Sequence, residues 1–305
     1  FGNSLVAVDV RTGERRWHFQ AIHHDIWDWD FPVPGQLVDL TVDGREIPAV
    51  VQTSKQAFVY AFNRETGEPI WPIEERPVPA GNVAGEWYSP TQPFPTRPAP
   101  YELQGLSVDD LMDYTPEHRQ MALDAVSDIK LGPIYTPWVT DTDPDGFRAT
   151  GMCPSATGGT NIPGGPVMDP ITGILYVQSR KACSGGRLSP GTDRDDGSVD
   201  GGNGIGVTVV DYGAGGGGGF TAIDGLPIVK PPFGRITAID MNTGEHLWWI
   251  PNGETPDRIA NHELLEGVDV PNTGYLGNAT ALVTASLLMY AEGRGGRPVF
   301  YAHDK

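Results

Sequence analysis

The feature that most constrains the fold is an eleven-residue pattern that occurs three times with the same spacing. The pattern, Ala-x-Asp/Asn-x-x-Thr-Gly-Glu-x-x-Trp, occupies residues 7–17, 61–71 and 238–248. An Asp or Asn side chain caps a turn, and glycine adopts the positive φ that a tight turn requires. Each copy therefore predicts a β-hairpin whose return strand delivers a tryptophan to a fixed place.

Repeated hairpins of this kind are typical of small sheets that pack radially, as in a β-propeller. A fourth copy begins at residues 300–305, with the sequence Phe-Tyr-Ala-His-Asp-Lys. Both ends of the chain therefore lie within repeats. We expect an all-β fold in which residues 1–305 form an arc of a larger ring, with four-stranded antiparallel blades. We expect the remaining propeller blades to lie outside this chain.

The segments between the copies show further strand patterns, two of which are joined by the turn Asp43-Gly44. Short apolar runs bounded by turn residues predict these strands. The expected strands cover residues 38–42, 47–53, 57–62, 173–179, 279–284, 287–291 and 298–301. Residues 184–219 are rich in Gly and Asp, and the glycine run at residues 213–219 is expected to be a loop.

Residues 72–131 lack the strand and hairpin patterns of the rest of the chain, and they predict a small insertion made of a loop and helices. Residues 72–100 are rich in proline, which predicts an extended surface loop. Residues 106–130 have a helical pattern, with Ser107 and Thr115 as helix caps.

Composition limits the partners. The net charge of -18 repels phosphate backbones, so we expect no nucleic acid partner. No apolar run is long enough to span a bilayer. The chain does not begin with Met, so the lack of a signal peptide is uninformative. Cys153 and Cys183 form either one disulfide or two free thiols, and a single pair does not define a compartment.

Residues 23–30, His-His-Asp-Ile-Trp-Asp-Trp-Asp, combine two imidazoles, two indoles and three carboxylates. Aromatic rings favour burial and carboxylates resist it, so a short segment with both indicates a metal, cofactor or proton-transfer site. The alternative is an aromatic blade edge with solvated carboxylates. A shared metal on His23 and His24 is disfavoured because adjacent residues of a strand point to opposite faces.

Asp28 and Lys55 are separated by two predicted strands joined by a tight turn. An outbound and a returning strand bring the chain back to the same end of a sheet, so both residues should lie at one rim of the propeller. A carboxylate and an ammonium there form a candidate acid/base pair. The alternative is a surface salt bridge, which contributes little.

With these features in place, the chain resembles the pyrroloquinoline quinone (PQQ)-dependent dehydrogenases. The resemblance rests on the hairpin repeats and on four segments of the sequence. The nearest branch is the membrane-bound quinoprotein glucose dehydrogenase type, which also includes quinate and polyol enzymes. The resemblance implies an eight-bladed propeller that holds PQQ and a divalent cation, usually Ca²⁺, near its axis. The four segments are residues 23–30, 52–64, 89–95 and 158–165.

The resemblance also implies roles for individual residues. Asp28 matches the general base, Lys55 matches the lysine that contacts the quinone oxygens, and Asn161 matches an asparagine near the cofactor. Asp30 matches an acidic position that joins the metal shell in lanthanide-dependent methanol dehydrogenases. Sugar-oxidising relatives carry this acid too, so we favour Ca²⁺ over a lanthanide, with the main metal ligands outside this chain. Ile162 departs from the tryptophan that is frequent in the family, which puts that wall of the pocket in question.

The implied function is oxidation of a sugar, polyol or other alcohol by base-assisted hydride transfer to PQQ. Electrons would pass to ubiquinone or a cytochrome. The implied location is the periplasm, with a membrane anchor formed by N-terminal helices outside this chain. The alternative is a non-catalytic propeller with the same repeats that acts as a scaffold or assembly factor. Such a protein needs no acid/base pair at the rim.

Overall fold

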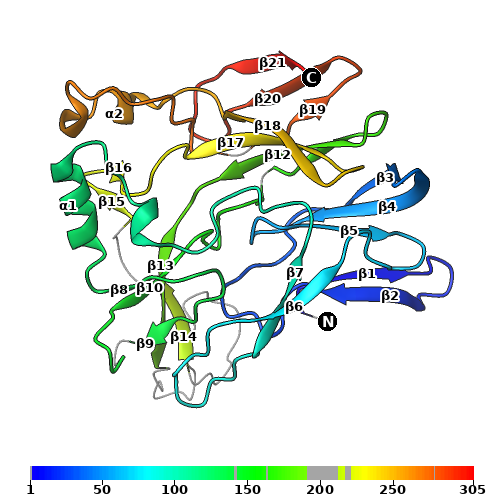
Figure 1. Cartoon of the computed structure of the whole chain (residues 1–305), viewed down its shortest axis with the longest axis horizontal. Helices are drawn as coiled ribbons and strands as arrows, with labels where there is room; N and C mark the ends of the chain where they lie inside the picture. The colour runs from blue at the N-terminus through cyan, green and yellow to red at the C-terminus, as the bar shows by residue number, and fades with distance from the viewer. Residues whose placement is uncertain (1, 141–142, 163, 191–211, 217–220, 278) are drawn as a thin grey trace, which may run out of the picture.

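The protein consists mainly of β-strands in small sheets, from the N-terminal hairpin to the C-terminal sheet (Figure 1). Most strand pairs are antiparallel, but β8–β10 and β9–β13 are parallel. The computed structural model describes residues 2–140, 143–162, 164–190, 212–216, 221–277 and 279–305. Within these ranges no helix has the length and apolar character needed to cross a membrane.

The three copies of the repeat form the predicted turns. In each copy, the Asp or Asn side chain accepts a hydrogen bond from the backbone amide two residues further on. The three acceptors are Asp9, Asn63 and Asp240, at 2.9, 2.9 and 2.8 Å. Strands β1 (Ser4–Val8) and β2 (Arg15–Gln20) flank the first turn. Strands β17 (Gly234–Asp240) and β18 (Glu245–Pro251) flank the third turn, and the second follows β5 (Val59–Asn63).

The tryptophan of one copy packs onto the turn of the next copy. The indole nitrogen of Trp17 donates to the carbonyl of Arg64 at 3.0 Å, and a Cβ atom built on Gly67 would lie 2.6 Å from Trp17 Cγ. A Cβ atom on Gly244, in the third turn, would lie 3.2 Å from Trp71. Successive repeats are therefore linked by tryptophan–turn contacts.

Gly67→Ala is expected to lower the free energy of unfolding by about 3 kcal/mol. The new methyl group clashes with Trp17, and the φ of +79° disfavours alanine. Gly13→Ala is a matched control, because Gly13 has a φ of +72° at the same repeat position with nothing within 4 Å of its Cβ site. Urea denaturation should show a loss of only about 1–2 kcal/mol for this control. Equal losses would show that the tryptophan contact contributes nothing.

Two neighbouring sheets support the site. One sheet contains β3 (Gln36–Val42), β4 (Arg45–Thr53) and β5, and Asp43 and Gly44 form the predicted turn with φ values of +50° and +73°. The other is a four-stranded antiparallel blade in the order β11 (Val167–Asp169), β12 (Ile174–Arg180), β17, β18, and among the sheets of the described residues it alone has the predicted number of strands. Buried side chains from both sheets form one core: Leu40, Val51, Val59, Leu175, Val177 and Ile239.

Other strands complete the arc. The C-terminal sheet contains β19 (Leu282–Val283), β20 (Leu287–Ala291) and β21 (Phe300–Asp304). Another sheet contains β8 (Ile129–Lys130), β9 (Val139–Thr140), β10 (Ala149–Met152), β13 (Ser184–Pro190) and β14 (Tyr212–Gly216). A short hairpin contains β15 (Ala222–Ile223) and β16 (Leu226–Pro227).

Two loop predictions are wrong in part. The proline-rich stretch contains the antiparallel pair β6 (Ile73–Pro77) and β7 (Thr91–Pro95). A two-stranded sheet has only edge strands, where proline is tolerated. The predicted loop at residues 213–219 overlaps β14, which pairs with β13, and residues 217–219 lie outside the described residues, as do residues 191–211.

The helical part is shorter than the predicted span of residues 106–130. It contains the 3-10 turn η1 (Val108–Asp110) after Ser107, and α1 (Pro116–Ala125), where Thr115 Oγ1 accepts from the His118 amide at 3.2 Å. Short helices α2 (Asp257–Ala260) and η2 (Glu263–Leu265) follow later.

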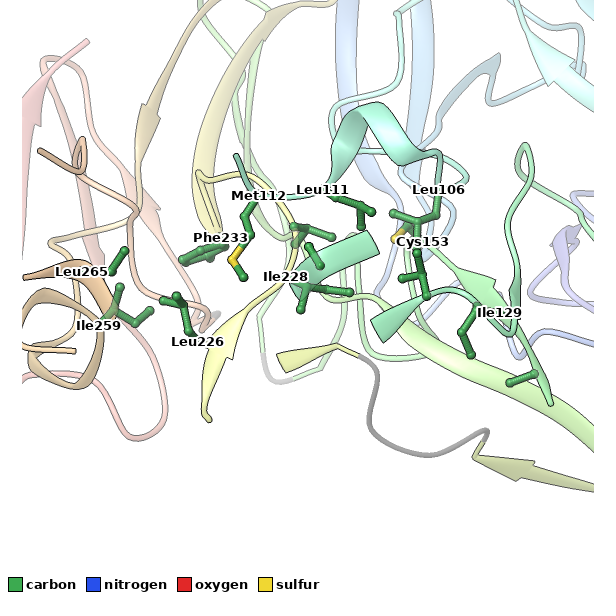
Figure 2. Close-up of a cluster of buried hydrophobic side chains, with 14 residues drawn as sticks. Leu106, Leu111, Met112, Ile129, Cys153, Leu226, Ile228, Phe233, Ile259 and Leu265 are labelled. Carbon is green, nitrogen blue, oxygen red and sulfur yellow. The ribbon is translucent and has the colours of Figure 1, made fainter. Parts of the chain in front are cut away.

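A hydrophobic core joins this helical region to the rest (Figure 2). Cys153 lies in this core and forms a disulfide with Cys183, with 4.6 Å between the two Cα atoms. The bond connects the segment after β10 to the segment before β13. Of the two states left open by the sequence, the structure therefore contains the disulfide. The other labelled members of the core are Leu106, Leu111, Met112, Ile129, Leu226, Ile228, Phe233, Ile259 and Leu265.

Candidate active site

Asp25 organises the loop that contains the His-His-Asp-Ile-Trp-Asp-Trp-Asp segment. Its carboxylate accepts hydrogen bonds from the backbone amides of Trp27 at 2.8 Å and Trp29 at 2.7 Å. The side-chain amide of Asn3 donates a third bond at 2.6 Å. Burial raises the pKa of Asp25 above its ordinary value, and the three hydrogen bonds offset only part of this rise. The Asp25 carboxylate therefore holds the backbone of this loop in its observed conformation.

The two tryptophans of this segment are buried and anchored. Their rings stack with centroids 5.3 Å apart, and the ring of Tyr135 packs edge-on against both. The indole nitrogen of Trp27 donates to the carbonyl of Thr136 at 3.0 Å, and that of Trp29 donates to the carbonyl of Pro154 at 3.1 Å. These contacts fix both ends of the turn that presents Asp28.

The two histidines contact different segments. His23 Nε2 lies 2.9 Å from Glu75, and His24 Nε2 lies 2.8 Å from Glu86. Across the described ranges, no group of three or more His, Cys, Asp and Glu side chains is arranged to hold a metal ion. The histidines thus connect the loop to β6 and to the segment before β7.

The structure brings Asp28 and Lys55 together at one rim. Lys55 lies in the turn between β4 and β5, and its Nζ atom donates to Asp28 Oδ2 at 3.1 Å. The ammonium also forms an ion pair with Asp30, whose carbonyl accepts from the Lys55 amide at 3.3 Å. The Lys55 side chain is 10% exposed, whereas that of Asp28 is 68% exposed. A buried cation therefore holds an accessible carboxylate.

The charge of Lys55 is stabilised by its partners. Burial lowers the pKa of the ammonium, but the hydrogen bonds to Asp30 and then Asp28 outweigh this effect. The pKa therefore lies above its ordinary value of 10.5, and Lys55 remains charged throughout the neutral and mildly alkaline range.

A pocket borders the exposed carboxylate of Asp28. Its volume is about 400 Å³. Asp28 reaches it from a left-handed backbone conformation with a φ of +63°, which aspartate tolerates better than most residues. Polar, aromatic and aliphatic side chains line this space next to a potential proton acceptor. The other lining residues are Asn3, Asp25, Ile26, Trp138, Leu188 and Tyr212.

Asn161 lies in a loop that packs against the Lys55 turn. A Cβ atom on Gly159 would lie only 2.4 Å from the carbonyl oxygen of Lys55, so the two backbones are in close contact. Asn161 itself is 8% exposed, and its amide donates to the carbonyl of Ala156 at 2.9 Å. The adjacent Ile162 is 68% exposed. The structure thus places the Asn161 loop beside Lys55.

Sequence reasoning missed Tyr101, which connects these two segments. It is fully buried, and its hydroxyl contacts both Ser54 and Thr160. Tyr101 lies just after the proline-rich stretch and belongs to no motif, so one sequence carries no signal for it.

Together, the fold and the rim define a β-propeller domain with an accessible carboxylate paired to a buried ammonium. The chain belongs to the PQQ family of glucose/ethanol/alcohol dehydrogenase β-propeller domains, whose profile matches residues 1–305. This match confirms the family resemblance and the β-propeller fold.

Several curated relatives are quinoprotein dehydrogenases. The chain is 28% identical over 265 residues to a probable quinate dehydrogenase (quinone) of Xanthomonas campestris pv. juglandis, covering 84% of this chain and 32% of the relative. It is 30% identical over 266 residues to the quinate/shikimate dehydrogenase (quinone) of Acinetobacter baylyi, with the same coverage of 84% and 32%. The chain therefore spans about a third of the length of these relatives.

A solved structure has the same fold. A europium-containing methanol dehydrogenase superposes with a TM-score of 0.51 at 20% identity, covering 94% of this chain and 36% of that chain.

Proposed function

We propose that this chain is part of a PQQ-dependent dehydrogenase that oxidises a sugar, polyol or other alcohol. The observation that carries the proposal is the exposed Asp28 carboxylate held 3.1 Å from the buried Lys55 ammonium, within a propeller of this family. Relatives named as quinate, glycerol and glucose dehydrogenases support the substrate class.

The chemistry of the donor groups fits PQQ. The Lys55 ammonium and the Asn161 side-chain amide donate hydrogen bonds, and quinone oxygens accept them. These two residues would hold the cofactor from adjacent segments. When bound, PQQ supplies the acceptor for the two electrons of the reaction.

Asp28 is assigned the proton transfer. A substrate hydroxyl in the adjacent pocket would donate its proton to a carboxylate oxygen of Asp28, which thereby acts as the general base. Lys55 orients this carboxylate through the hydrogen bond to Oδ2. The loop around Asp25 holds the Asp28 backbone in place through hydrogen bonds to the tryptophans on either side.

A divalent cation forms the second part of the proposed site, and we favour Ca²⁺. Carboxylate oxygens are the ligands that Ca²⁺ prefers, so Asp30 would contribute to its coordination. Ca²⁺ takes about six to eight oxygen ligands, so we expect the main ligands to come from outside this chain.

We further propose that ubiquinone or a cytochrome accepts the electrons and that the protein works in the periplasm, anchored by N-terminal helices outside this chain. The name "quinone" in two relatives supports a quinone acceptor. The Cys153–Cys183 disulfide supports an oxidising compartment.

Reconstitution tests the proposal. The complete protein is mixed with PQQ and Ca²⁺, and cofactor uptake is followed by absorbance, with dye reduction measured for glucose, glycerol, quinate and ethanol. We expect uptake of PQQ and dye reduction with at least one substrate, and loss of activity on chelation that Ca²⁺ reverses. A protein that takes up no PQQ would instead fit the scaffold alternative.

A further inference from the structure

The Tyr101 hydroxyl lies between the two segments that carry Lys55 and Asn161. It is 2.6 Å from the carbonyl oxygen of Ser54 and 2.7 Å from Oγ1 of Thr160. A carbonyl oxygen can only accept, and a tyrosine hydroxyl has one hydrogen. Tyr101 therefore donates to Ser54 and accepts from the Thr160 hydroxyl, which fixes the direction of both bonds.

These two partners immediately precede the proposed cofactor residues. Ser54 is followed by Lys55, and Thr160 is followed by Asn161. The side chains of Ser54, Thr160 and Tyr101 are each 0% exposed, so water does not compete for the bonds. One hydroxyl group thus connects the Lys55 turn to the Asn161 loop.

The backbone of Tyr101 is also held in place. Its amide donates to the carbonyl of Ala57 at 3.1 Å, in the same turn as Lys55. Its carbonyl accepts from the guanidinium of Arg235, on β17 of the four-stranded blade. Arg235 also forms an ion pair with the buried Glu102 at 3.4 Å. Tyr101 is therefore held in place by its own backbone contacts, and its hydroxyl contacts both the Lys55 turn and the Asn161 loop.

We propose that Tyr101 is a positioning residue that sets the spacing between Lys55 and Asn161 for cofactor binding. The inference rests on the proposed function, because it assigns these two residues to PQQ. Tyr101 is fully buried, and its hydroxyl contacts Ser54 and Thr160 rather than Lys55 and Asn161 themselves. Its effect should therefore appear first in cofactor affinity rather than in substrate affinity.

Tyr101→Phe removes the shared hydroxyl and keeps the aromatic ring. We expect the Kd for PQQ to rise about tenfold, measured by fluorescence titration of the complete protein with Ca²⁺ present. The KM for substrate in the cofactor-saturated enzyme should change less than about twofold. Tyr290→Phe is the matched control, because Tyr290 is 2% exposed and its hydroxyl lies 3.1 Å from His303 in the C-terminal sheet. Its Kd for PQQ should match that of the wild type.

A double-mutant cycle measures how the hydrogen bond between Tyr101 and Thr160 contributes to PQQ affinity. Thr160→Val removes the hydroxyl partner at nearly constant volume, and we expect its Kd for PQQ to rise about threefold. The double variant should bind PQQ no more weakly than Tyr101→Phe alone, because each change breaks the same bond. If Tyr101→Phe does not fold, Thr160→Val alone carries the test, and an unchanged Kd would overturn the proposal.

The outcomes separate the two proposals. A wild-type protein that binds no PQQ contradicts the proposed function. A wild-type protein that binds PQQ, together with Tyr101→Phe that binds it equally well, overturns the positioning role and leaves the proposed function intact.

Discussion

Asp28→Asn is expected to lower kcat by about 10²–10⁴-fold while PQQ still binds. Asparagine has nearly the same shape and tolerates the left-handed φ of +63° at this position. A neutral amide cannot accept the proton of a substrate hydroxyl, so the proton transfer is lost. The measurement is dye reduction at saturating PQQ and substrate, with the Kd for PQQ determined in parallel.

Asp43→Asn provides the matched control. Asp43 also has a left-handed backbone, with a φ of +50°, and it lies in the exposed turn between β3 and β4. Its activity should equal that of the wild type. An Asp28→Asn enzyme with wild-type kcat would rule out Asp28 as the general base.

Lys55→Met is expected to lower kcat/KM by about 10²-fold and to weaken PQQ binding. Methionine fills a similar volume but leaves the carboxylates of Asp28 and Asp30 without their shared cation. We expect the free energy of unfolding to fall by about 1–2 kcal/mol, less than for a fully buried pair because Asp28 is mostly exposed.

The stabilising effect of Lys55 has a defined pH dependence. Its pKa is raised in the folded protein, so its contribution is fully present below the ordinary pKa of 10.5 and is lost as pH rises through the folded value. Urea denaturation should therefore show a constant difference between wild type and Lys55→Met from pH 7 to about pH 10 that shrinks above it.

Lys230→Met is the control for the kinetic and PQQ-binding effects of Lys55→Met. Its ammonium forms one ion pair with Asp113 at 2.7 Å, and its side chain is 41% exposed. Kinetic constants and PQQ affinity should remain those of the wild type. Full activity and unchanged PQQ affinity in Lys55→Met would contradict the assigned role of Lys55.

The sequence was sufficient to predict the Asp28–Lys55 pair because the prediction needed only strand direction. Two antiparallel strands, β3 and β4, return the chain to the rim where β3 starts, and this does not depend on how their side chains pack. The hairpin turns were equally predictable, since each is formed by residues within one copy of the repeat.

Contacts between distant segments were not predictable from one sequence. The packing of Trp17 on Gly67 and the bridge from Tyr101 to Ser54 and Thr160 depend on how separate sheets are placed. The hairpin β6–β7 was missed for a different reason. Its strands contain prolines, which disfavour a strand prediction even though edge strands accept them.

The direction of the tryptophan contacts has a consequence for synthesis on the ribosome. Trp17 emerges 50 residues before Gly67, and Trp71 emerges 173 residues before Gly244. At translation rates of about 5–20 residues per second, Gly67 is synthesised seconds after Trp17. Gly244 is synthesised on the order of tens of seconds after Trp71. The Trp71 indole therefore lacks its partner turn, and can meet wrong hydrophobic partners, while the segment between positions 71 and 244 is being made.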